Sequence, residues 1–367
     1  MRTLEGRILT DEGWLQGQIT FDHRVQHLSP AKLTAPDRTP RTILPGFIDL
    51  HVHGGAGVDI MEGGDSARKI SRMHAGHGTT ALLATTMTAP ESEIVTALKG
   101  ISRAMVDHTT DGARILGAHL EGPFLNAKRL GAQPPFVTHA TLELVERFRE
   151  LAPITVLTLA PEVDGHLALI PQLSALGIRV QLGHSSGSYE DGLAALRAGA
   201  SGFTHLFNGM TGFSHYNPGM VGAALAHAEY AELIPDLHHV APGAILAAMR
   251  SIPRLYCVTD ATAATGMPDG EYSLGSQRVI KCQGCVRLRT GSLAGSSLTM
   301  DQALRNLVGL GLDLGEASKR LSAYPALYLG LQDRGRIAAG TWADLVVLNE
   351  QLEVEQVFVE GRAIPLH

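Results

Sequence analysis

The chain has 367 residues, which is enough for one large α/β barrel or for two ordinary domains. Its formal net charge of −6, without any block of like charge, gives little support to a nucleic-acid or membrane-surface partner. Hydrophobic residues make up 44% of the chain, so a sizeable core is available, but no apolar run reaches the roughly 18 residues of a membrane helix.

The start of the chain and its cysteines bear on the cellular compartment. The first 18 residues are polar and strand-like, without a basic stretch followed by an apolar run, so we expect no signal peptide. The 3 cysteines cannot all pair, and they indicate no disulfide framework. Both features favour a cytoplasmic protein.

The central part of the chain alternates apolar, strand-like runs with Ala- and Leu-rich helical runs. The predicted strands are 46–51, 79–85, 114–120, 154–160, 178–183, 201–206, 230–237 and 254–259. The predicted helices between them are 66–76, 91–107, 141–150, 165–176, 189–198 and 242–250. Eight strands that alternate with helices predict an α/β fold, a (β/α)8 or TIM barrel.

The two ends of the chain have a different pattern. Apolar and polar positions alternate in 1–44 and again in 334–367, which predicts half-buried antiparallel strands. Because the barrel separates these ends, we expect them to meet in one small β-sandwich domain, beside a catalytic barrel domain at 45–333. The segment 269–298 follows the last barrel strand, and we expect it to be a loop with a hairpin.

Cysteine and histidine residues outside the strand ends have simpler interpretations. Cys282 and Cys285 have the spacing of half a zinc knuckle, but no second pair lies nearby, so we favour a hairpin turn over a metal site. His74 and His77 lie three apart in a predicted helix and are expected to be packing or capping residues. Cys257 lies inside the eighth strand and is expected to be buried.

Residues that can bind a metal follow five of the predicted strands. These are His51 and His53 on the first strand, Glu121 on the third, His184 on the fifth, His205 on the sixth and Asp260 on the eighth. The active site of a (β/α)8 barrel lies at the carboxyl ends of its strands, and alternate residues of a strand point the same way. Imidazole and carboxylate are suitable ligands for a divalent metal such as zinc.

A single histidine at a strand end is more often a hydrogen-bonded polar residue than a ligand. His184 or His205 alone would therefore carry little weight. The pair His51 and His53 strengthens the metal hypothesis, and five ligands at four strand ends of one barrel rim, with Asp260 on another strand, make coincidence a poor explanation. The sequence thus predicts a metal site from this combination.

Several segments together resemble a known family. They are PGFIDLHVHG (45–54), HLEGPF (119–124), LGHS (182–185), THLFN (204–208), VTDA (258–261), LAGSSLTMD (293–301) and GRIAAGTWADLVVLN (335–349). The set resembles the amidohydrolase superfamily and, more narrowly, the N-acetylglucosamine-6-phosphate deacetylases. The resemblance extends from about Leu44 to Asn349, and the HLEGPF, THLFN and LAGSSLTM segments are its more specific part.

The resemblance implies a divalent metal cofactor, one or two ions of zinc or of ferrous iron. Glu121, His184 and His205 would hold the principal metal. His51 and His53 would hold a second metal in a position that only some members of the family occupy.

The resemblance also implies how an N-acetyl amino sugar would bind and react. Asp260 would be the general base and acid, because it is the only carboxylate at these strand ends besides Glu121. Asn208 and Gly209 would line the sugar pocket, and His239 would polarise the amide carbonyl or bind phosphate. Members of the family are typically homodimers.

Three positions near the expected substrate pocket depart from the family pattern. Tyr216 stands where the family usually has an arginine that reaches the substrate phosphate of a neighbouring subunit. Gln133 replaces a histidine, and Leu237 replaces a glycine. Tyrosine cannot supply the charge of a bidentate arginine, and His215, Lys128 or Arg129 are the basic residues available to compensate.

Three functional hypotheses follow. The leading one is deacetylation of N-acetylglucosamine 6-phosphate. The second is the same chemistry on an unphosphorylated sugar or another N-acyl amine, which the departures at Tyr216, Gln133 and Leu237 favour. The third is a catalytically silent barrel that binds a sugar phosphate, which no residue of the sequence favours.

Overall fold

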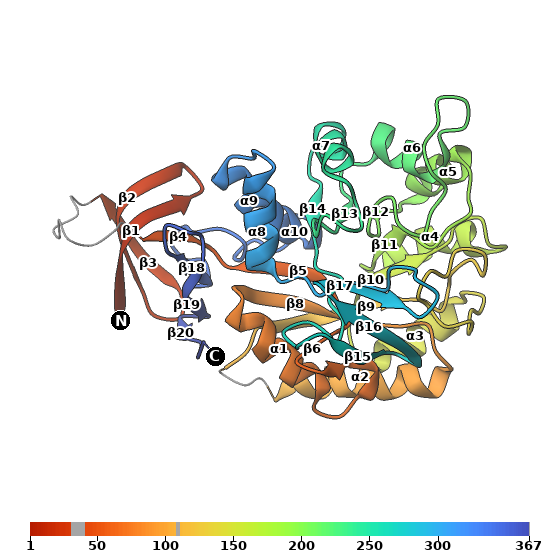
Figure 1. Cartoon of the computed structure of the whole chain (residues 1–367), viewed down its shortest axis with the longest axis horizontal. Helices are drawn as coiled ribbons and strands as arrows, with labels where there is room; N and C mark the ends of the chain where they lie inside the picture. Colours follow the sequence, from red (N-terminus) through yellow and green to blue (C-terminus); the bar gives the residue numbers. More distant parts are fainter. Residues whose placement is uncertain (31–40, 108–110, 367) are drawn as a thin grey trace.

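The computed structural model describes residues 1–30, 41–107 and 111–366. It consists of a barrel of alternating strands and helices and a sheet built from both chain ends, and both termini lie in the sheet (Figure 1). Within the described residues, no helix is both long and apolar enough to cross a membrane.

Eight parallel strands form the barrel, which confirms the predicted (β/α)8 fold. They are β5 (Phe47–Val52), β8 (Thr79–Thr86), β9 (Arg114–Glu121), β10 (Ile154–Leu159), β11 (Arg179–Leu182), β12 (Gly202–Phe203), β13 (Glu232–Leu233) and β14 (Tyr256–Cys257). The first six form one sheet in the order β12-β11-β10-β9-β8-β5, and β13 pairs with β14. Both β5 and β8 are buried along their whole length, as expected for strands covered on both faces.

The barrel closes through contacts beyond these ladders. The backbone N–H of Leu206 donates to the carbonyl of Glu232 at 2.8 Å, and the N–H of Asp260 donates to the carbonyl of His51 at 3.0 Å. The last three strands are shorter than predicted, with two residues each. One reason is that His205 and Asp260 have φ angles of 29° and 51°, which interrupt the extended backbone just where the site begins.

Six helices occur where the sequence predicts them. They are α1 (Ser66–Gly76), α2 (Glu91–Val106), α3 (Leu142–Leu151), α4 (His166–Ala175), α5 (Tyr189–Ala198) and α7 (Pro242–Ser251). Local signals start and stop them. Ser188 and Asp191 form a capping box at the start of α5, and Gly199 ends that helix with a φ of 112°.

Four further helices were not predicted. They are α6 (Gly219–His227), α8 (Met300–Gly309), α9 (Leu314–Leu321) and α10 (Ala323–Leu329). The first six residues of α6 are all buried, so its sequence GMVGAALAH lacks the polar face that marks a surface helix. The other three follow the last barrel strand and lie outside the β/α alternation. A short 3-10 helix (Ile60–Glu62) and two short strands, β6 (Gly54–Gly55) and β7 (Val58–Asp59), precede α1.

The two ends of the chain meet in one seven-stranded sheet, as predicted. Its order is β20-β19-β18-β4-β1-β2-β3. The strands are β1 (Arg2–Thr10), β2 (Gly13–Phe21), β3 (Val25–Pro30), β4 (Thr42–Pro45), β18 (Leu345–Leu348), β19 (Val354–Val359) and β20 (Arg362–Ala363). Phe21 and Phe358 contact each other edge to face with ring centroids 5.1 Å apart, so distant strands of the sheet share one core, as in a sandwich.

A buried ion-pair group joins the sheet to the barrel. Arg334 contacts both Asp344 and Glu360. Arg114, at the start of β9, donates to both carboxylate oxygens of Glu360 at 3.0 and 3.1 Å. These bonds hold the terminal sheet against one end of the barrel.

The segment after β14 forms a small antiparallel sheet, which contains the predicted hairpin. Its strands are β15 (Gly270–Leu274), β16 (Gln277–Cys282) and β17 (Cys285–Leu288). Cys282 and Cys285 lie opposite each other across a turn in which Gln283 and Gly284 have φ angles of 52° and 77°. Both cysteines are free thiols, and Cys257 is a third, buried one. This confirms the hairpin turn predicted at these positions.

Candidate metal centre

The barrel fold brings all six of the predicted metal and proton-transfer residues to one rim. His51 and His53 come from β5 and the residue after it, Glu121 ends β9, and His184, His205 and Asp260 follow β11, β12 and β14. Each of the six is at most 7% exposed. His184, His205 and Asp260 all have positive φ angles, of 48°, 29° and 51°. Such strained backbone in three residues of one rim is typical of functional sites.

Glu121, His184 and His205 form the first of three groups of described residues that could hold an ion; the third is His51, His119 and Glu232. The Nε2 atoms of His184 and His205 lie 3.1 and 3.0 Å from Oε1 of Glu121. The same two nitrogens lie 3.1 Å from each other. One ion can therefore contact all three atoms, which gives the donor set of a site with room for a water or substrate oxygen.

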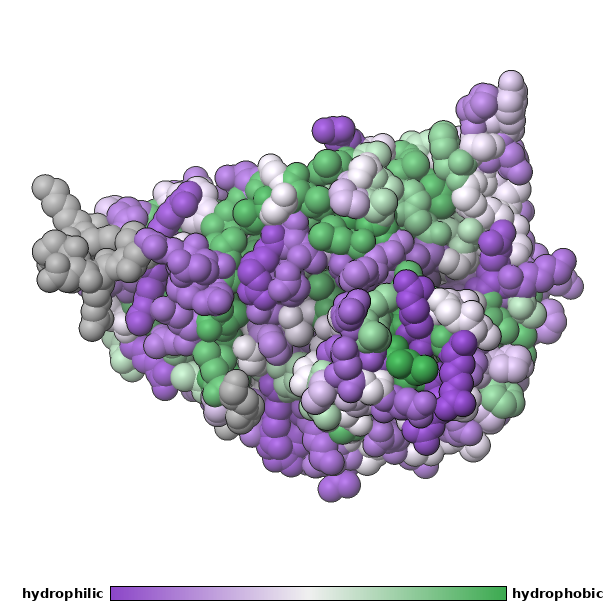
Figure 2. Space-filling view, in the orientation of Figure 1, coloured by the Kyte–Doolittle hydropathy of each residue, from purple (hydrophilic) through white to green (hydrophobic). Residues whose placement is uncertain are grey.

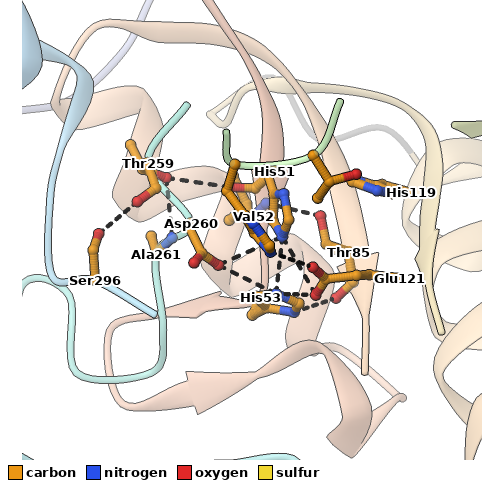
Figure 3. Close-up of polar contacts among 12 residues, drawn as sticks. His51, Val52, His53, Thr85, His119, Glu121, Thr259, Asp260, Ala261 and Ser296 are labelled. Carbon is orange, nitrogen blue, oxygen red and sulfur yellow. Dashed lines mark hydrogen bonds and ion pairs between the residues drawn. The ribbon is translucent and has the colours of Figure 1, made fainter. Parts of the chain in front are cut away.

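His51, His53 and Asp260 form the second group (Figure 3). The Nε2 atoms of the two histidines are 3.1 Å apart. Oδ1 of Asp260 lies 3.5 Å from Nε2 of His51 and 3.3 Å from Nε2 of His53. The other oxygen of Glu121, Oε2, lies 3.1 Å from Nε2 of His53, so this carboxylate faces both groups.

Hydrogen bonds to the far side of the rings fix which nitrogen faces the centre. Nδ1 of His184 lies 2.8 Å from the carbonyl oxygen of Arg129, and Nδ1 of His53 lies 3.2 Å from that of Thr85. A carbonyl oxygen only accepts, so each Nδ1 carries a proton, and Nε2 is the nitrogen left to bind either a second proton or a metal ion. Lone pairs about 3 Å apart repel each other unless a cation lies between them. These residues therefore fit a metal ion.

His119 also lies in the barrel, but its ring is fully occupied. Its Nδ1 lies 3.1 Å from the carbonyl oxygen of Leu50, and its Nε2 lies 2.7 Å from the hydroxyl of Thr158. Neither nitrogen is left to bind a ligand, so His119 is a structural member of the barrel interior.

The electrostatics of the centre favour ionised carboxylates. Burial by itself raises the pKa of Glu121, but the charge of His51 and the hydrogen bonds from His184 and His205 outweigh burial and hold the pKa well below its ordinary value. Burial lowers the pKa of His53, whereas its bonds to Asp260 and Glu121 raise that pKa to about 9. The carboxylates of the centre are therefore ionised, and protons or a metal ion on the ring nitrogens balance their charge.

A pocket opens directly on this centre. It is lined by residues of the first two ligand groups together with Met87, Gly131, Ala132, Gln133, Asn208, Gly209, His239, Leu274, Leu293 and Gly295. Four of the five predicted substrate-binding residues therefore lie in its wall. The fifth, Tyr216, does not: its side chain is 89% exposed, and it stacks on His215 in the loop before α6.

Two pocket residues are held by bonds that the sequence does not reveal. Nε2 of Gln133 donates to Oε2 of Glu121 at 2.6 Å, and its Oε1 accepts from the backbone N–H of Thr88 at 2.7 Å. Nδ1 of His239 lies 2.7 Å from Oδ2 of Asp236. Gln133 therefore contacts a candidate metal ligand as well as the pocket.

Sequence reasoning missed several residues that build the site. Glu232 contacts His51, and the backbone carbonyls of Arg129 and Thr85 orient two histidines. Apolar residues from the hairpin segment, including Leu274 and Leu293, form part of the pocket wall. The available signal for Glu232 was a carboxylate inside the apolar run of the seventh predicted strand. No local pattern marks a backbone carbonyl as an acceptor for a distant ring.

Leu237 has a φ of 67°, in the left-handed region that favours glycine. This is the position where the related family usually has glycine. The strain lies two residues before His239, in the loop between β13 and α7. The departure noted in the sequence is therefore accommodated by an unusual leucine conformation.

Known proteins resemble this chain in sequence over most of its length. The amidohydrolase family matches residues 42–364. The chain is 40% identical to the N-acetylgalactosamine-6-phosphate deacetylase of Escherichia coli O157:H7, with 97% of each chain covered. It is 42% identical to the N-acetylglucosamine-6-phosphate deacetylase of Vibrio furnissii, with 89% of this chain and 83% of the relative covered.

Solved structures show the same similarity. The N-acetyl-D-glucosamine-6-phosphate deacetylase of Mycobacterium smegmatis superposes with a TM-score of 0.91 and 33% identity, over 100% of both chains. The N-acetylglucosamine-6-phosphate deacetylase of Thermotoga maritima superposes with a TM-score of 0.89 and 29% identity, over 99% of both chains. The chain therefore belongs to the amidohydrolase family.

Proposed function

We propose that this protein is a metal-dependent amide hydrolase that converts N-acetylglucosamine 6-phosphate to glucosamine 6-phosphate and acetate. The observation that carries the proposal is that one pocket is lined by residues of two ligand groups, Asp260 among them. The names of the relatives at 40% and 42% identity support an N-acetylhexosamine 6-phosphate as the substrate class.

We propose that Glu121, His184 and His205 hold the principal divalent metal, with zinc as the first choice because it suits imidazole and carboxylate ligands. A metal at such a site acts as a Lewis acid and lowers the pKa of a bound water to about 7, which supplies a nucleophile at neutral pH. His51 and His53, with Asp260 beside them, form the position for a second ion.

Asp260 is the proposed proton shuttle. Its side chain lies at the pocket floor, and burial raises its pKa, but the charges of His51 and His53 and the hydrogen bond with His53 lower it overall. An ionised carboxylate can accept a proton from the attacking water and later donate it to the departing sugar amine. Both proton transfers are needed because an amine is a poor leaving group until it is protonated.

The pocket wall supplies the proposed substrate contacts. Asn208 and Gly209 line it on one side, and His239 is placed to donate from Nε2 to an amide carbonyl or a phosphate oxygen, because Asp236 holds its Nδ1. Gln133 also lines the pocket, but its side-chain nitrogen is bonded to Glu121, so any contact with the substrate would be made next to that bond.

We further propose that the protein is a cytoplasmic homodimer. Each chain is proposed to divide into a terminal β domain (1–44 and 334–367) and a catalytic domain (45–333). Exposed Phe213 and Tyr216 lie in the loop before α6, at 60% and 89% exposure, and hydrophobic residues gather over α6 and α7 on the face shown in Figure 2. Exposed apolar residues of this kind are typical of an interface. The free thiols are consistent with a reducing compartment.

The name of the Escherichia coli relative favours one second candidate, N-acetylgalactosamine 6-phosphate. The two sugars are epimers at one hydroxyl, so they present the same amide and phosphate to the site. The unphosphorylated alternative has less support, because the relatives reported above are named for phosphorylated sugars.

Acetate release by the zinc-loaded protein tests the proposal. We expect kcat/KM to be highest for one of the two phosphorylated N-acetylhexosamines and lower for unphosphorylated N-acetylglucosamine. Equal activity on the phosphorylated and unphosphorylated sugars would contradict the phosphate requirement. An absence of acetate release from all three substrates would overturn the deacetylase proposal.

A further inference from the structure

Glu232 is a buried carboxylate directly behind His51. It begins β13, is fully buried, and its Oε2 lies 3.0 Å from Nδ1 of His51 on the far side of that ring from the ligand groups. The two residues are 181 positions apart in the sequence. Glu232 does not line the pocket, so its effect on the centre must pass through the His51 ring.

The hydrogen bonds around Glu232 fix which oxygen faces His51. Nε2 of Gln181 donates to Oε1 at 3.1 Å, and the hydroxyl of Tyr256 donates to Oε1 at 3.2 Å. Oε2 accepts from Nδ1 of His51 at 3.0 Å and, more weakly, from the backbone N–H of His205 at 3.5 Å. A carboxylate oxygen that only accepts places the ring proton on Nδ1, and Nε2 then presents its lone pair to His53 and Asp260.

We propose that Glu232 is a positioning residue that fixes the tautomer of His51 and so makes Nε2 of His51 a ligand for the second metal. The proposal deepens the proposed function and rests on it, because it assumes that a metal ion binds at His51, His53 and Asp260. A residue that hydrogen-bonds to the far nitrogen of a metal-binding histidine commonly contributes 10- to 100-fold to metal affinity.

Glu232→Gln tests the proposal with little change in shape. Gln181 and Tyr256 both donate to one oxygen, so the new amide should keep its oxygen toward them and turn its nitrogen toward His51. An amide N–H donates, which makes Nδ1 of His51 an acceptor and moves the ring proton to Nε2. The nitrogen that should bind metal is then blocked.

The first measurement is a titration of metal-free protein with Cd²⁺ under chelator-buffered conditions, followed by ¹¹³Cd NMR. We expect two resonances for the wild type. The resonance of the second ion is the one that disappears in His53→Asn. In Glu232→Gln this resonance should require about 10- to 100-fold more free Cd²⁺ to appear. The resonance from Glu121, His184 and His205 should keep its affinity.

The second measurement needs no metal. Long-range ¹H–¹⁵N spectra of the metal-free protein, recorded at a pH high enough for the His51 ring to be neutral, distinguish the two tautomers of that ring. We expect the His51 proton on Nδ1 in the wild type and on Nε2 in Glu232→Gln. An unchanged His51 tautomer in the variant would overturn the proposal even if the variant bound cadmium less tightly.

Asp49→Asn is the matched control. Asp49 is also a fully buried barrel carboxylate, and it accepts from the hydroxyl of Thr259 at 2.6 Å and from the backbone N–H of His51 at 3.3 Å, but it does not contact the His51 ring. We expect this variant to keep both cadmium resonances at wild-type affinity. Equal loss of the second resonance in Asp49→Asn would assign the effect to general barrel damage and overturn the proposal.

The outcomes separate this inference from the proposed function. Wild-type affinity for both ions in Glu232→Gln, or a wild type that binds one ion only, would overturn the role of Glu232 and leave the hydrolase proposal standing. A wild type that binds no metal while folded would overturn the hydrolase proposal itself.

Discussion

Nδ1 of His239 lies 2.7 Å from Oδ2 of Asp236, and both side chains are largely buried beside the pocket. Oδ1 of Asp236 also accepts from the backbone N–H groups of His238 and His239, at 2.9 and 2.8 Å. Burial by itself lowers the pKa of His239, but the hydrogen bond and charge of Asp236 outweigh burial and raise that pKa above its ordinary value. The pair therefore favours a cationic ring at the pocket wall.

The first prediction concerns the pH dependence of substrate binding. A raised pKa means that His239 is protonated below that pKa and loses its charge as pH rises through it. We therefore expect KM for the phosphorylated substrate to rise as pH increases through the raised pKa of His239. In Asp236→Asn the pKa of His239 should fall, so the rise in KM should begin at lower pH. At a pH between the two pKa values we expect KM of the variant to be about tenfold higher, from the loss of a charge-assisted hydrogen bond.

Steady-state kinetics between pH 5.5 and 9 measure this effect. The shift should appear mainly in KM, because Asp236 lies outside the ligand groups. Superimposable KM profiles for the wild type and Asp236→Asn would show that the charge of His239 plays no part in binding.

The second prediction concerns Asp260. Asn is close in shape to Asp and tolerates the φ of 51° at this position, so Asp260→Asn should fold normally. It should lower kcat by about 10²- to 10⁴-fold, because the amide cannot accept and return the proton. Acetate release and metal content are the measurements, and the metal at Glu121, His184 and His205 should remain.

Asp313→Asn is the control for this change. Asp313 caps α9, and Asn caps a helix about as well as Asp, so its activity and stability should match the wild type. An unchanged rate in Asp260→Asn would refute the proton-transfer role.

The third prediction concerns the ion pairs between the sheet and the barrel. The Arg334 side chain is 7% exposed and contacts Asp344 and Glu360, so Arg334→Met leaves buried carboxylates without this guanidinium. We expect the free energy of unfolding to fall by about 3 to 5 kcal/mol. Urea denaturation measures the loss.

Arg336→Met is the comparison for that variant. Its pair with Asp11 is open to solvent, with side-chain exposures of 47% and 38%, and should contribute about 0 to 1 kcal/mol. Similar losses in Arg334→Met and Arg336→Met would contradict the view that burial decides the contribution of these pairs.

The fourth prediction concerns acid stability. His74 on α1 is fully buried, with Nε2 2.9 Å from the carbonyl oxygen of Gly54, and burial lowers its pKa to about 4. The unfolded chain binds this proton near pH 6.5, so stability is lost as pH falls from about 6.5 to about 4. The loss attributable to His74 is about 3 kcal/mol.

The measurement is urea denaturation of metal-free wild type and His74→Gln across that pH range. Gln does not titrate, so the stability of the wild type relative to the variant should shrink as pH falls. A difference that stays constant from pH 7 to pH 4 would show that His74 does not titrate as proposed.

The sequence predicted the barrel well where its strands are uniformly buried. The strands β5 and β8 are continuous apolar runs, and H-x-H directly after such a run places His51 and His53 on the rim. The prediction was less accurate where local and tertiary requirements differ. The strands β12 and β14 end early because His205 and Asp260 adopt positive φ angles, and the buried α6 lacks an amphipathic pattern.

The metal-ligand residues named from the sequence alone do meet in space, because parallel barrel strands bring their carboxyl ends to one rim whatever their separation in sequence. Only the tertiary structure decided how each ring faces that rim. The bonds from His51 to Glu232, from His184 to the carbonyl of Arg129 and from Gln133 to Glu121 depend on barrel closure and loop packing. No local periodicity encodes such contacts, because they join segments whose distance is set by the whole fold.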